Sequence, residues 1–390
     1  MNVPDYGGVL RSLHDLGPGS VADSLAALAQ RAGAVDVVVH LVDFARTVLV
    51  PVPARGVHVE LPVVQPVCDT LPGQAFTELR VVSERRPEGT RVWVPILEGS
   101  DCTGVLAMTL RVELDDEVRR RCEELGMFAG SAISLAARTT DQYNLVRRHR
   151  AMSLAAGRQW DLLPPLRLQT PEVVSNAVLE PAYDVGGDCF DHNVNGPNLN
   201  LAIMDAMGHG LESSMTSSLA IGSYRHDRRE GQALAVIHQR LDGVLARTYA
   251  GERFVTGQLA RLDLGRGEMT WINAGHPAPF LIRGGRVVGT LKCRPSLPWG
   301  LGGAVEQEGT EALEPGDSVL LYTDGVTEGR SSAGDPFGVD RLVGLVERAA
   351  DADGPTSAVL DRLIQEVLTY QDRRLRDDAT MVWVTWRGPR

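Results

Sequence analysis

The sequence has almost no lysine, and its cysteines follow no metal-binding pattern. Lys292 is the only lysine among 390 residues, so a mechanism that needs a nucleophilic lysine has a single candidate. The five cysteines are scattered and are never separated by only two residues, which argues against a disulfide framework and a zinc knuckle. No H-E-x-x-H segment occurs either, so the usual zinc patterns are missing.

Long apolar runs and an excess of positive charge are also missing. No stretch approaches the ~18 consecutive apolar residues of a membrane span, and the first residues lack the basic-then-apolar layout of a signal peptide. We therefore expect a cytoplasmic protein with no membrane partner. The net charge of −11 argues against a nucleic-acid partner, because such binding depends on clustered lysine and arginine.

The composition that remains is typical of a globular protein with two domains. Hydrophobic residues make up 43% of the chain and charged residues 23%, and 390 residues exceed one ordinary domain of ~100–200. In the first part, apolar spacing predicts a helix at residues 21–34, strands at 35–43, 91–97 and 104–112, and a long helix at 115–138. These elements form a small α+β module.

Residues 139–163 keep helical spacing but are strongly polar. Tyr143, Val146 and Met152 form a weak apolar stripe that arginine and histidine interrupt. An exposed connector helix and a helix that pairs two copies of the chain as a homodimer therefore both remain open. The prolines of "LLPPL" end this helix, because proline lacks a backbone N–H and disfavours helix before it.

The second half mixes strands and helices in separate runs. Strands are predicted at residues 198–204, 254–264, 268–274, 317–323 and 379–386, with a hairpin within "APFLIRGGRVVGTL". Helices are predicted at residues 211–227, 232–249, 339–350 and 357–370. This order indicates an α+β fold in which helices cover a pair of sheets, not a parallel sheet with regular alternation.

Three acidic residues stand where a predicted strand stops and a glycine-rich turn begins, and a pair of acids forms a fourth site. They are Asp188 in "DVGGDCFD", Asp205 in "IMDAMGHG" and Asp324 in "LYTDGVTEG", and the pair Asp377 and Asp378 in "LRDDATMVW" precedes another strand. Each acid alone is more simply a turn residue. Converging carboxylates, however, would raise one another's pKa unless a cation neutralised them, and no matching set of basic residues accompanies them.

Two hard divalent cations would supply that counter-charge. Mg²⁺ and Mn²⁺ prefer carboxylate, carbonyl and water oxygens. Two such ions ~3.5–4 Å apart would activate a bridging water and stabilise a phosphoryl group. The acids therefore predict a phosphohydrolase that forms no covalent intermediate.

The same motifs resemble a known family. "DVGGDCFD", "MDAMGHG", "WINAGHPAPFLI", "LLYTDGVTEGR" and "DDATMVWV" are similar, in order, to the motifs of the SpoIIE-type, RsbU-like branch of the metal-dependent (PPM, type 2C) serine/threonine protein phosphatases. The resemblance covers about residues 170–388. It implies an α-β-β-α sandwich with a binuclear Mn²⁺ or Mg²⁺ centre. It also implies hydrolysis of phosphoserine or phosphothreonine on a phosphorylated anti-sigma-factor antagonist of the STAS type.

The resemblance also implies roles for individual residues. The implied metal ligands are Asp188, Asp205, the Ala206 carbonyl, Asp324 and Asp377. Asp377 is preferred to Asp378 because the first acid of this motif is the family's ligand. His209 is a candidate general acid, but it lies four residues after Asp205 and related branches place their histidine two residues after the acid, so a role in fixing the turn remains equally open. His276 of "NAGHP" is interpreted as structural.

The front half resembles a GAF sensor domain. "LPGQAF", "VWVPILEGSDCTGVLAMTL" and the long closing helix are similar to that family. The predicted layout is a GAF-like domain at 18–140, a helical linker at 141–165 and a phosphatase domain at 166–388. Whether the GAF-like domain binds a small molecule or only dimerises is left open. Two rival functions also stay open, a phosphatase for a small phosphorylated metabolite and a non-catalytic binding module.

Overall fold

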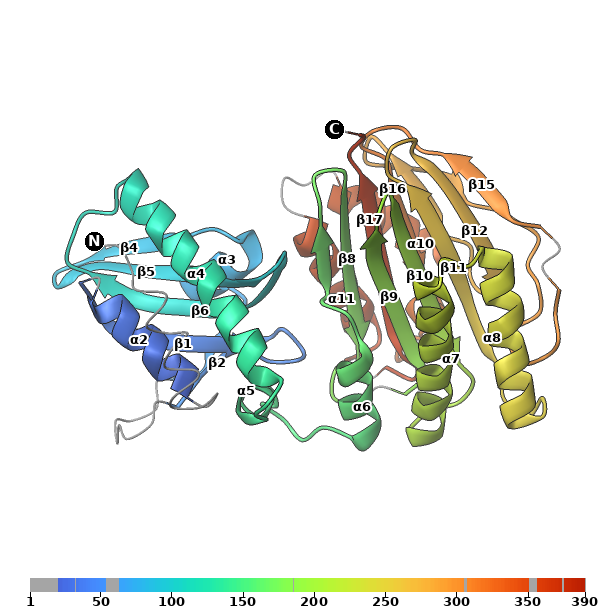
Figure 1. Cartoon of the computed structure of the whole chain (residues 1–390), viewed down its shortest axis with the longest axis horizontal. Coiled ribbons are helices and arrows are strands. Elements are labelled where there is room, and N and C mark those ends of the chain that lie inside the picture. Colours follow the sequence, from blue (N-terminus) through green and yellow to red (C-terminus); the bar gives the residue numbers. More distant parts are fainter. Residues whose placement is uncertain are drawn as a thin grey trace. The chain divides into compact units, whose positions relative to one another are not determined.

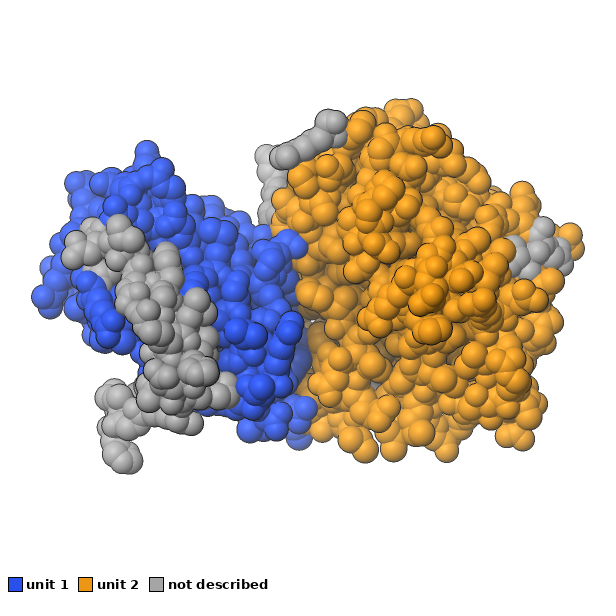
Figure 2. Space-filling view, in the orientation of Figure 1, with its two compact units in different colours: residues 1–151 blue, residues 152–390 orange. Residues whose placement is uncertain are grey.

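The computed structural model of the chain forms two compact units, residues 1–151 and residues 152–390 (Figure 2). It describes residues 20–31, 33–53, 63–184, 186–304, 307–350, 356–373 and 375–389. Residues 18, 19, 32 and 54–62 of the predicted GAF-like range lie outside the described residues. In the described ranges, no helix is both long enough and apolar enough to span a membrane.

Unit 1 is built on one antiparallel sheet with the strand order β3-β2-β1-β6-β5-β4 (Figure 1). Its strands are β1 (Ala34–Val42), β2 (Val48–Pro51), β3 (Gln65–Pro66), β4 (Val82–Arg86), β5 (Gly89–Glu98) and β6 (Asp101–Leu110). Its helices are α2 (Val21–Arg31), α3 (Leu71–Glu78), α4 (Asp116–Ala137) and α5 (Gln142–Arg147). One core cluster joins the sheet to α2, α4 and α5, and a second joins it to α3 through Phe76.

The predicted connector helix is two short helices instead of one. α5 ends at Arg147 and α6 (Leu154–Leu162) begins after Ser153, whose side chain accepts a hydrogen bond from the Ala156 N–H at 3.1 Å. This N-cap starts a new helix, so the expectation of one continuous helix over 139–163 is wrong. Each short helix packs into its own unit. Tyr143 of α5 lies in the core of unit 1, and Met152, beside α6, packs in unit 2.

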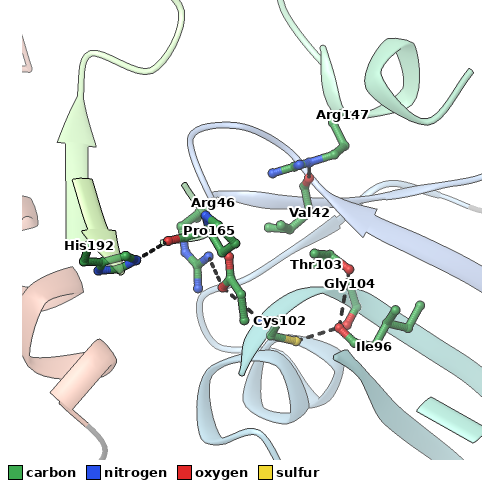
Figure 3. Close-up of polar contacts among 10 residues, drawn as sticks. Val42, Arg46, Ile96, Cys102, Thr103, Gly104, Arg147, Pro165 and His192 are labelled. Atoms are coloured by element: carbon green, nitrogen blue, oxygen red, sulfur yellow. Dashed lines mark hydrogen bonds and ion pairs between the residues drawn. The ribbon is translucent and has the colours of Figure 1, made fainter. Parts of the chain in front are cut away.

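Polar contacts hold each end of the connector. The Arg147 side chain donates from Nε to the Val42 carbonyl at 3.1 Å, within unit 1 (Figure 3). In unit 2, His192 Nε2 lies 2.7 Å from the Pro165 carbonyl, next to the residues that end the α6 segment (Figure 3). Residues 148–153 are the chain segment between α5 and α6.

Unit 2 consists of two antiparallel sheets packed face to face, with helices on both outer sides (Figure 1). The first sheet contains β15 (Gly309–Ala312), β12 (Glu268–Ala274), β11 (Val255–Asp263), β10 (Asn198–Ala206) and β9 (Asp188–Asn195). The second contains β14 (Arg286–Thr290), β13 (Phe280–Arg283), β16 (Ser318–Tyr322), β17 (Ala379–Trp386), β8 (Val173–Glu180) and β7 (Arg167–Gln169). The helices are α7 (Leu211–Arg229), α8 (Leu234–Tyr249), α9 (Asp324–Thr327), α10 (Val339–Ala350) and α11 (Thr356–Tyr370).

Strand β10 shows why the sequence gives this layering. Leu201 and Ile203 belong to the core between the two sheets, and Ala202 and Met204 belong to the core beneath α7 and α8. Alternate residues of a strand point to opposite faces, so a strand that is covered on both faces is apolar throughout. A third cluster packs α10 and α11 on the second sheet. The predicted α+β class is confirmed.

Candidate metal centre

Two of the predicted acids lie side by side at the end of the first sheet. Asp205 of β10 pairs directly with Asp188 of β9 in the antiparallel ladder, and directly paired residues point to the same face. Ile203, two residues before Asp205, lies in the core between the sheets, so this face looks toward the second sheet. Asp188 begins its strand. The expectation that it follows a strand was wrong, because the two glycines form the turn that leads into β9.

Hydroxyl groups of the second sheet hold Asp188. Its Oδ2 accepts hydrogen bonds from Thr323 Oγ1 at 2.7 Å and from Thr380 Oγ1 at 2.6 Å. Thr323 follows β16 and Thr380 is in β17, and the Asp188 side chain is buried. The carboxylate of Asp188 therefore joins the two sheets at the edge where the acids meet. Sequence reasoning missed both threonines, although each stands one or two residues from an acid that it selected.

The two acids of "DDAT" have different surroundings. Asp378 is buried, and its Oδ2 accepts hydrogen bonds from the backbone N–H groups of Gly186 at 2.8 Å, Gly187 at 2.7 Å and Asp188 at 3.2 Å. Asp378 thus fixes the turn before β9. Asp377 is exposed and lines an open pocket of about 190 Å³. This difference supports Asp377 as the acid available for a ligand.

Asp324 lines the same pocket as Asp377 and is the first residue of α9. A Cβ atom on the next residue, Gly325, would lie 1.9 Å from the Asp378 carbonyl oxygen. Any side chain at this position would therefore collide with the backbone of the other motif. Glycine at position 325 is what allows the "TDG" and "DDAT" segments to lie against each other.

A second close approach occurs at Gly187. A Cβ atom there would lie 2.4 Å from the Ala206 carbonyl oxygen, and the Ala206 N–H donates to the Gly187 carbonyl at 3.3 Å. The Ala206 carbonyl, a predicted ligand, therefore faces the glycine turn. A larger residue at position 187 would displace one segment or the other.

The carboxylates raise one another's pKa values. Burial, followed by the charges of Asp205 and Asp378, raises the pKa of Asp188 well above its ordinary value of 3.8. Burial, and then the charges of Asp324, Asp377 and Asp378, raises the pKa of Asp205 to about 7. Burial, followed by Asp377 and Glu328, also raises the pKa of Asp324. No basic residue is among these causes, so the predicted excess of negative charge is present at this edge.

The chemistry of these donors fits a hard divalent cation. Carboxylate and carbonyl oxygens are the ligands that Mg²⁺ and Mn²⁺ prefer, and a cation would relieve the repulsion that raises the pKa values. In the part of the chain that the structure describes, no three His, Cys, Asp or Glu side chains lie close enough together to hold a metal ion. The assignment of individual ligands therefore stays a prediction.

The two histidines differ in their surroundings. His209 is exposed in the turn between β10 and α7, and no contact with the acids is found for it among the described residues. His276 is buried, its Nδ1 lies 3.0 Å from Thr256 Oγ1, and Thr256 pairs with Asp205 across β10 and β11. Burial lowers the pKa of His276 to about 3, so the ring is neutral. These contacts support a structural role for His276.

Comparison with known families finds a match for most of unit 2. Residues 195–387 match the family described as stage II sporulation protein E (SpoIIE). These residues form a SpoIIE-family domain. The matched range contains Asp205, Ala206, Asp324 and Asp377, and Asp188 lies just before it.

Two curated proteins are similar to the chain over part of its length. The chain is 26% identical over 325 residues to Protein IcfG of Synechocystis sp.. This alignment covers 75% of this chain and 51% of the relative. It is 24% identical over 233 residues to phosphoserine phosphatase RsbU of Bacillus subtilis, with 59% of this chain and 68% of the relative covered. The chain thus spans about half the length of IcfG and about two thirds of RsbU.

The solved structures to which the chain is similar include two phosphatase domains. The SiaA-PP2C domain of Pseudomonas aeruginosa has a TM-score of 0.48 and 20% identity, with 55% of this chain and 86% of that chain covered. The PP2C phosphatase domain of SpoIIE from Bacillus subtilis, with a fragment of its regulatory domain, has a TM-score of 0.48 and 20% identity, with 56% and 64% covered.

Proposed function

We propose that the chain is a metal-dependent phosphatase that hydrolyses phosphoserine or phosphothreonine in a protein. The observation that carries this proposal is that Asp188, Asp205 and Asp324, which come from both sheets, all have pKa values raised by burial and by neighbouring carboxylates. The SpoIIE-family match, which contains Asp205 and Asp324, and the similarity to phosphoserine phosphatase RsbU support it.

The site residues have distinct roles in this proposal. Asp188, Asp205, Ala206, Asp324 and Asp377 would hold a binuclear Mn²⁺ or Mg²⁺ centre, which when bound would supply an activated water and stabilise the charge of the phosphoryl group. Thr323 and Thr380 orient Asp188, and Asp378 fixes the turn that presents it. His209 would protonate the leaving oxygen or only shape the turn.

The proposed substrate is a phosphorylated anti-sigma-factor antagonist of the STAS type, in a partner-switching pathway. The RsbU-like motifs of residues 170–388 support this choice. A small phosphorylated metabolite is the second candidate substrate, because the pocket beside Asp324 has a volume of about 190 Å³, which suits a small phosphate ester.

We also propose that the GAF-like unit regulates the phosphatase through α6. Ser214 Oγ of α7 donates to the Ala155 carbonyl of α6 at 3.4 Å, so the two helices are in contact within unit 2. α7 begins directly after the turn that follows Asp205. A displacement of α6 would therefore act on the segment that positions this acid. A chain without residues 1–140 that stays folded by circular dichroism should differ from the full chain in activity, and identical kinetics would contradict the coupling.

The proposed activity is tested by phosphate release from phosphorylated antagonist proteins in the presence of Mn²⁺. The wild type should be active and EDTA should abolish activity. Asp324→Asn should reduce activity by about a hundredfold or more, because a metal ligand contributes several kcal/mol to transition-state stabilisation. Asp340→Asn, an exposed aspartate at the start of α10, is the matched control and should retain activity.

The outcomes separate the rival functions. Fast hydrolysis of p-nitrophenyl phosphate without hydrolysis of any antagonist protein would support a metabolite phosphatase. If neither substrate is hydrolysed with Mn²⁺, or if Asp324→Asn is as active as the wild type, the proposed metal-dependent catalysis is refuted. The non-catalytic binding module would then be the remaining function.

A further inference from the structure

The pocket beside Asp324 contains one positively charged side chain. Arg376 lines this pocket, and the other lining residues are Asp324, Gly325, Glu328, Gly329, Gln371 and Asp377. Arg376 directly precedes Asp377 and is exposed. It is thus the one basic residue among the described residues that line the pocket.

Arg376 is not paired with the acids around it. No hydrogen bond or ion pair is found for its side chain within the described residues, although Glu328 and Asp377 line the same pocket. Arg283, by contrast, is held by two hydrogen bonds to Asp317, at 2.9 and 2.7 Å. The Asp324 carboxyl, whose pKa is raised, has no contribution from Arg376 among its causes. Neutralising the acids is therefore not what Arg376 does in this arrangement.

Gln371 supports the glycines that line the pocket. Gln371 is buried and its Nε2 donates to the Gly325 carbonyl at 3.4 Å. A Cβ atom on Gly329 would lie 2.0 Å from Gln371 Nε2, so the amide packs tightly against this glycine. Because Gln371 and the glycines already form the wall, Arg376 is not needed to build the pocket. Its guanidinium is available to a ligand.

We propose that Arg376 binds the phosphoryl group of the substrate. This inference rests on the proposed phosphatase function. A phosphomonoester carries a charge of about −1.5 to −2 at neutral pH, and a planar guanidinium matches its oxygens with two parallel hydrogen bonds. Arg376 is a cation, so it is not a metal ligand. It supplies phosphate recognition on the chain itself, beside the acids Asp324 and Asp377.

Inorganic phosphate, the reaction product, tests this proposal without turnover. Its binding to the full chain at saturating Mn²⁺ is measured by calorimetry for wild type, Arg376→Ala and Arg376→Lys. Arg376→Ala should bind phosphate about tenfold or more weakly, and lysine should restore part of the affinity because it keeps the charge but loses the fork geometry. The KM for a phosphorylated protein should rise with a smaller change in kcat.

The matched control is Arg387→Ala. Arg387 is exposed and lies just beyond the end of β17, while Arg376 lies just before its start. A strand of eight residues separates the two by about 26 Å, at ~3.3 Å per residue. Phosphate binding by Arg387→Ala should equal that of the wild type. Mn²⁺ binding by Arg376→Ala should not weaken, because a guanidinium cation is not a metal ligand.

The outcomes distinguish this inference from the proposed function. Equal phosphate affinity of Arg376→Ala and wild type would overturn it, and so would a wild type that binds no phosphate. A parallel loss of Mn²⁺ and phosphate binding in Arg376→Ala would also overturn it, since the residue would then support the metal centre. Arg376-dependent phosphate binding in a chain that hydrolyses no phosphoprotein would sustain the inference and refute the proposed function.

Discussion

Replacing Asp205 with asparagine should stabilise the metal-free protein above neutral pH. The folded state raises the pKa of Asp205 from the ordinary 3.8 to about 7, first through burial and then through the charges of Asp324, Asp377 and Asp378. Each pKa unit corresponds to about 1.4 kcal/mol, so a rise of about three means that the charged form of Asp205 destabilises the folded state by at most about 4 kcal/mol. Partial exposure of this carboxyl to solvent reduces the expected effect to about 2 kcal/mol.

The direction of the pH dependence follows from proton binding. Between about pH 4 and about pH 7 the folded state keeps a proton on Asp205 that the unfolded state has lost, so stability falls as the pH rises through this window. Asparagine is neutral and similar in shape, and it removes this contribution. The gain of Asp205→Asn over wild type should therefore be small at about pH 4 and full at about pH 8.

Urea unfolding in EDTA at both pH values measures this difference. Adding Mn²⁺ at the higher pH should stabilise the wild type more than the variant, because a bound ion stabilises the state that binds it. Asp340→Asn serves as the control for loss of one negative charge. A variant no more stable than the wild type at the higher pH would refute the reasoning that the acids repel one another at this edge.

Two further substitutions test the supports of the site. Gly187→Ala places a Cβ atom 2.4 Å from the Ala206 carbonyl oxygen. It should lower the free energy of unfolding, measured in urea, by about 1–3 kcal/mol. The control is Gly289→Ala, which has no atom within 4 Å of the new Cβ and should leave the free energy of unfolding almost unchanged. Thr380→Val removes the 2.6 Å hydrogen bond to Asp188 and should weaken Mn²⁺ binding about tenfold in calorimetry. Unchanged Mn²⁺ affinity in Thr380→Val would show that Asp188 needs no orientation from the second sheet.

Elements with unbroken patterns could be predicted from the sequence. β12, β17 and α10 have the predicted bounds, because apolar runs and helical spacing are local properties of the chain. β8 and β9 were not predicted, because polar residues interrupt them. Ser175 of β8 bonds to the ring of His192 in β9 at 2.8 Å, and Asp191 of β9 bonds to Arg225 of α7 at 2.8 Å. These partners are distant in the sequence, so their burial is a tertiary effect.

The acids of the candidate site could be predicted from the sequence, but the contacts that each acid makes could not. The motifs identified Asp205 and Asp324, and the structure places both in the group whose pKa values are raised. The different surroundings of Asp377 and Asp378 depend on the backbone path before β17, which sends one carboxylate to the pocket and the other to the glycine turn. Arg376 could not be selected from the motifs, since its relevance comes from the pocket that it lines.

The most direct test of the account is a calorimetric titration of the full chain with Mn²⁺. A binuclear centre predicts two Mn²⁺ ions per wild-type chain, with at least one binding event lost in Asp324→Asn and both retained in Asp340→Asn. No Mn²⁺ binding by the wild type would contradict the claim that these carboxylates form a metal centre, and so would equal binding by Asp324→Asn.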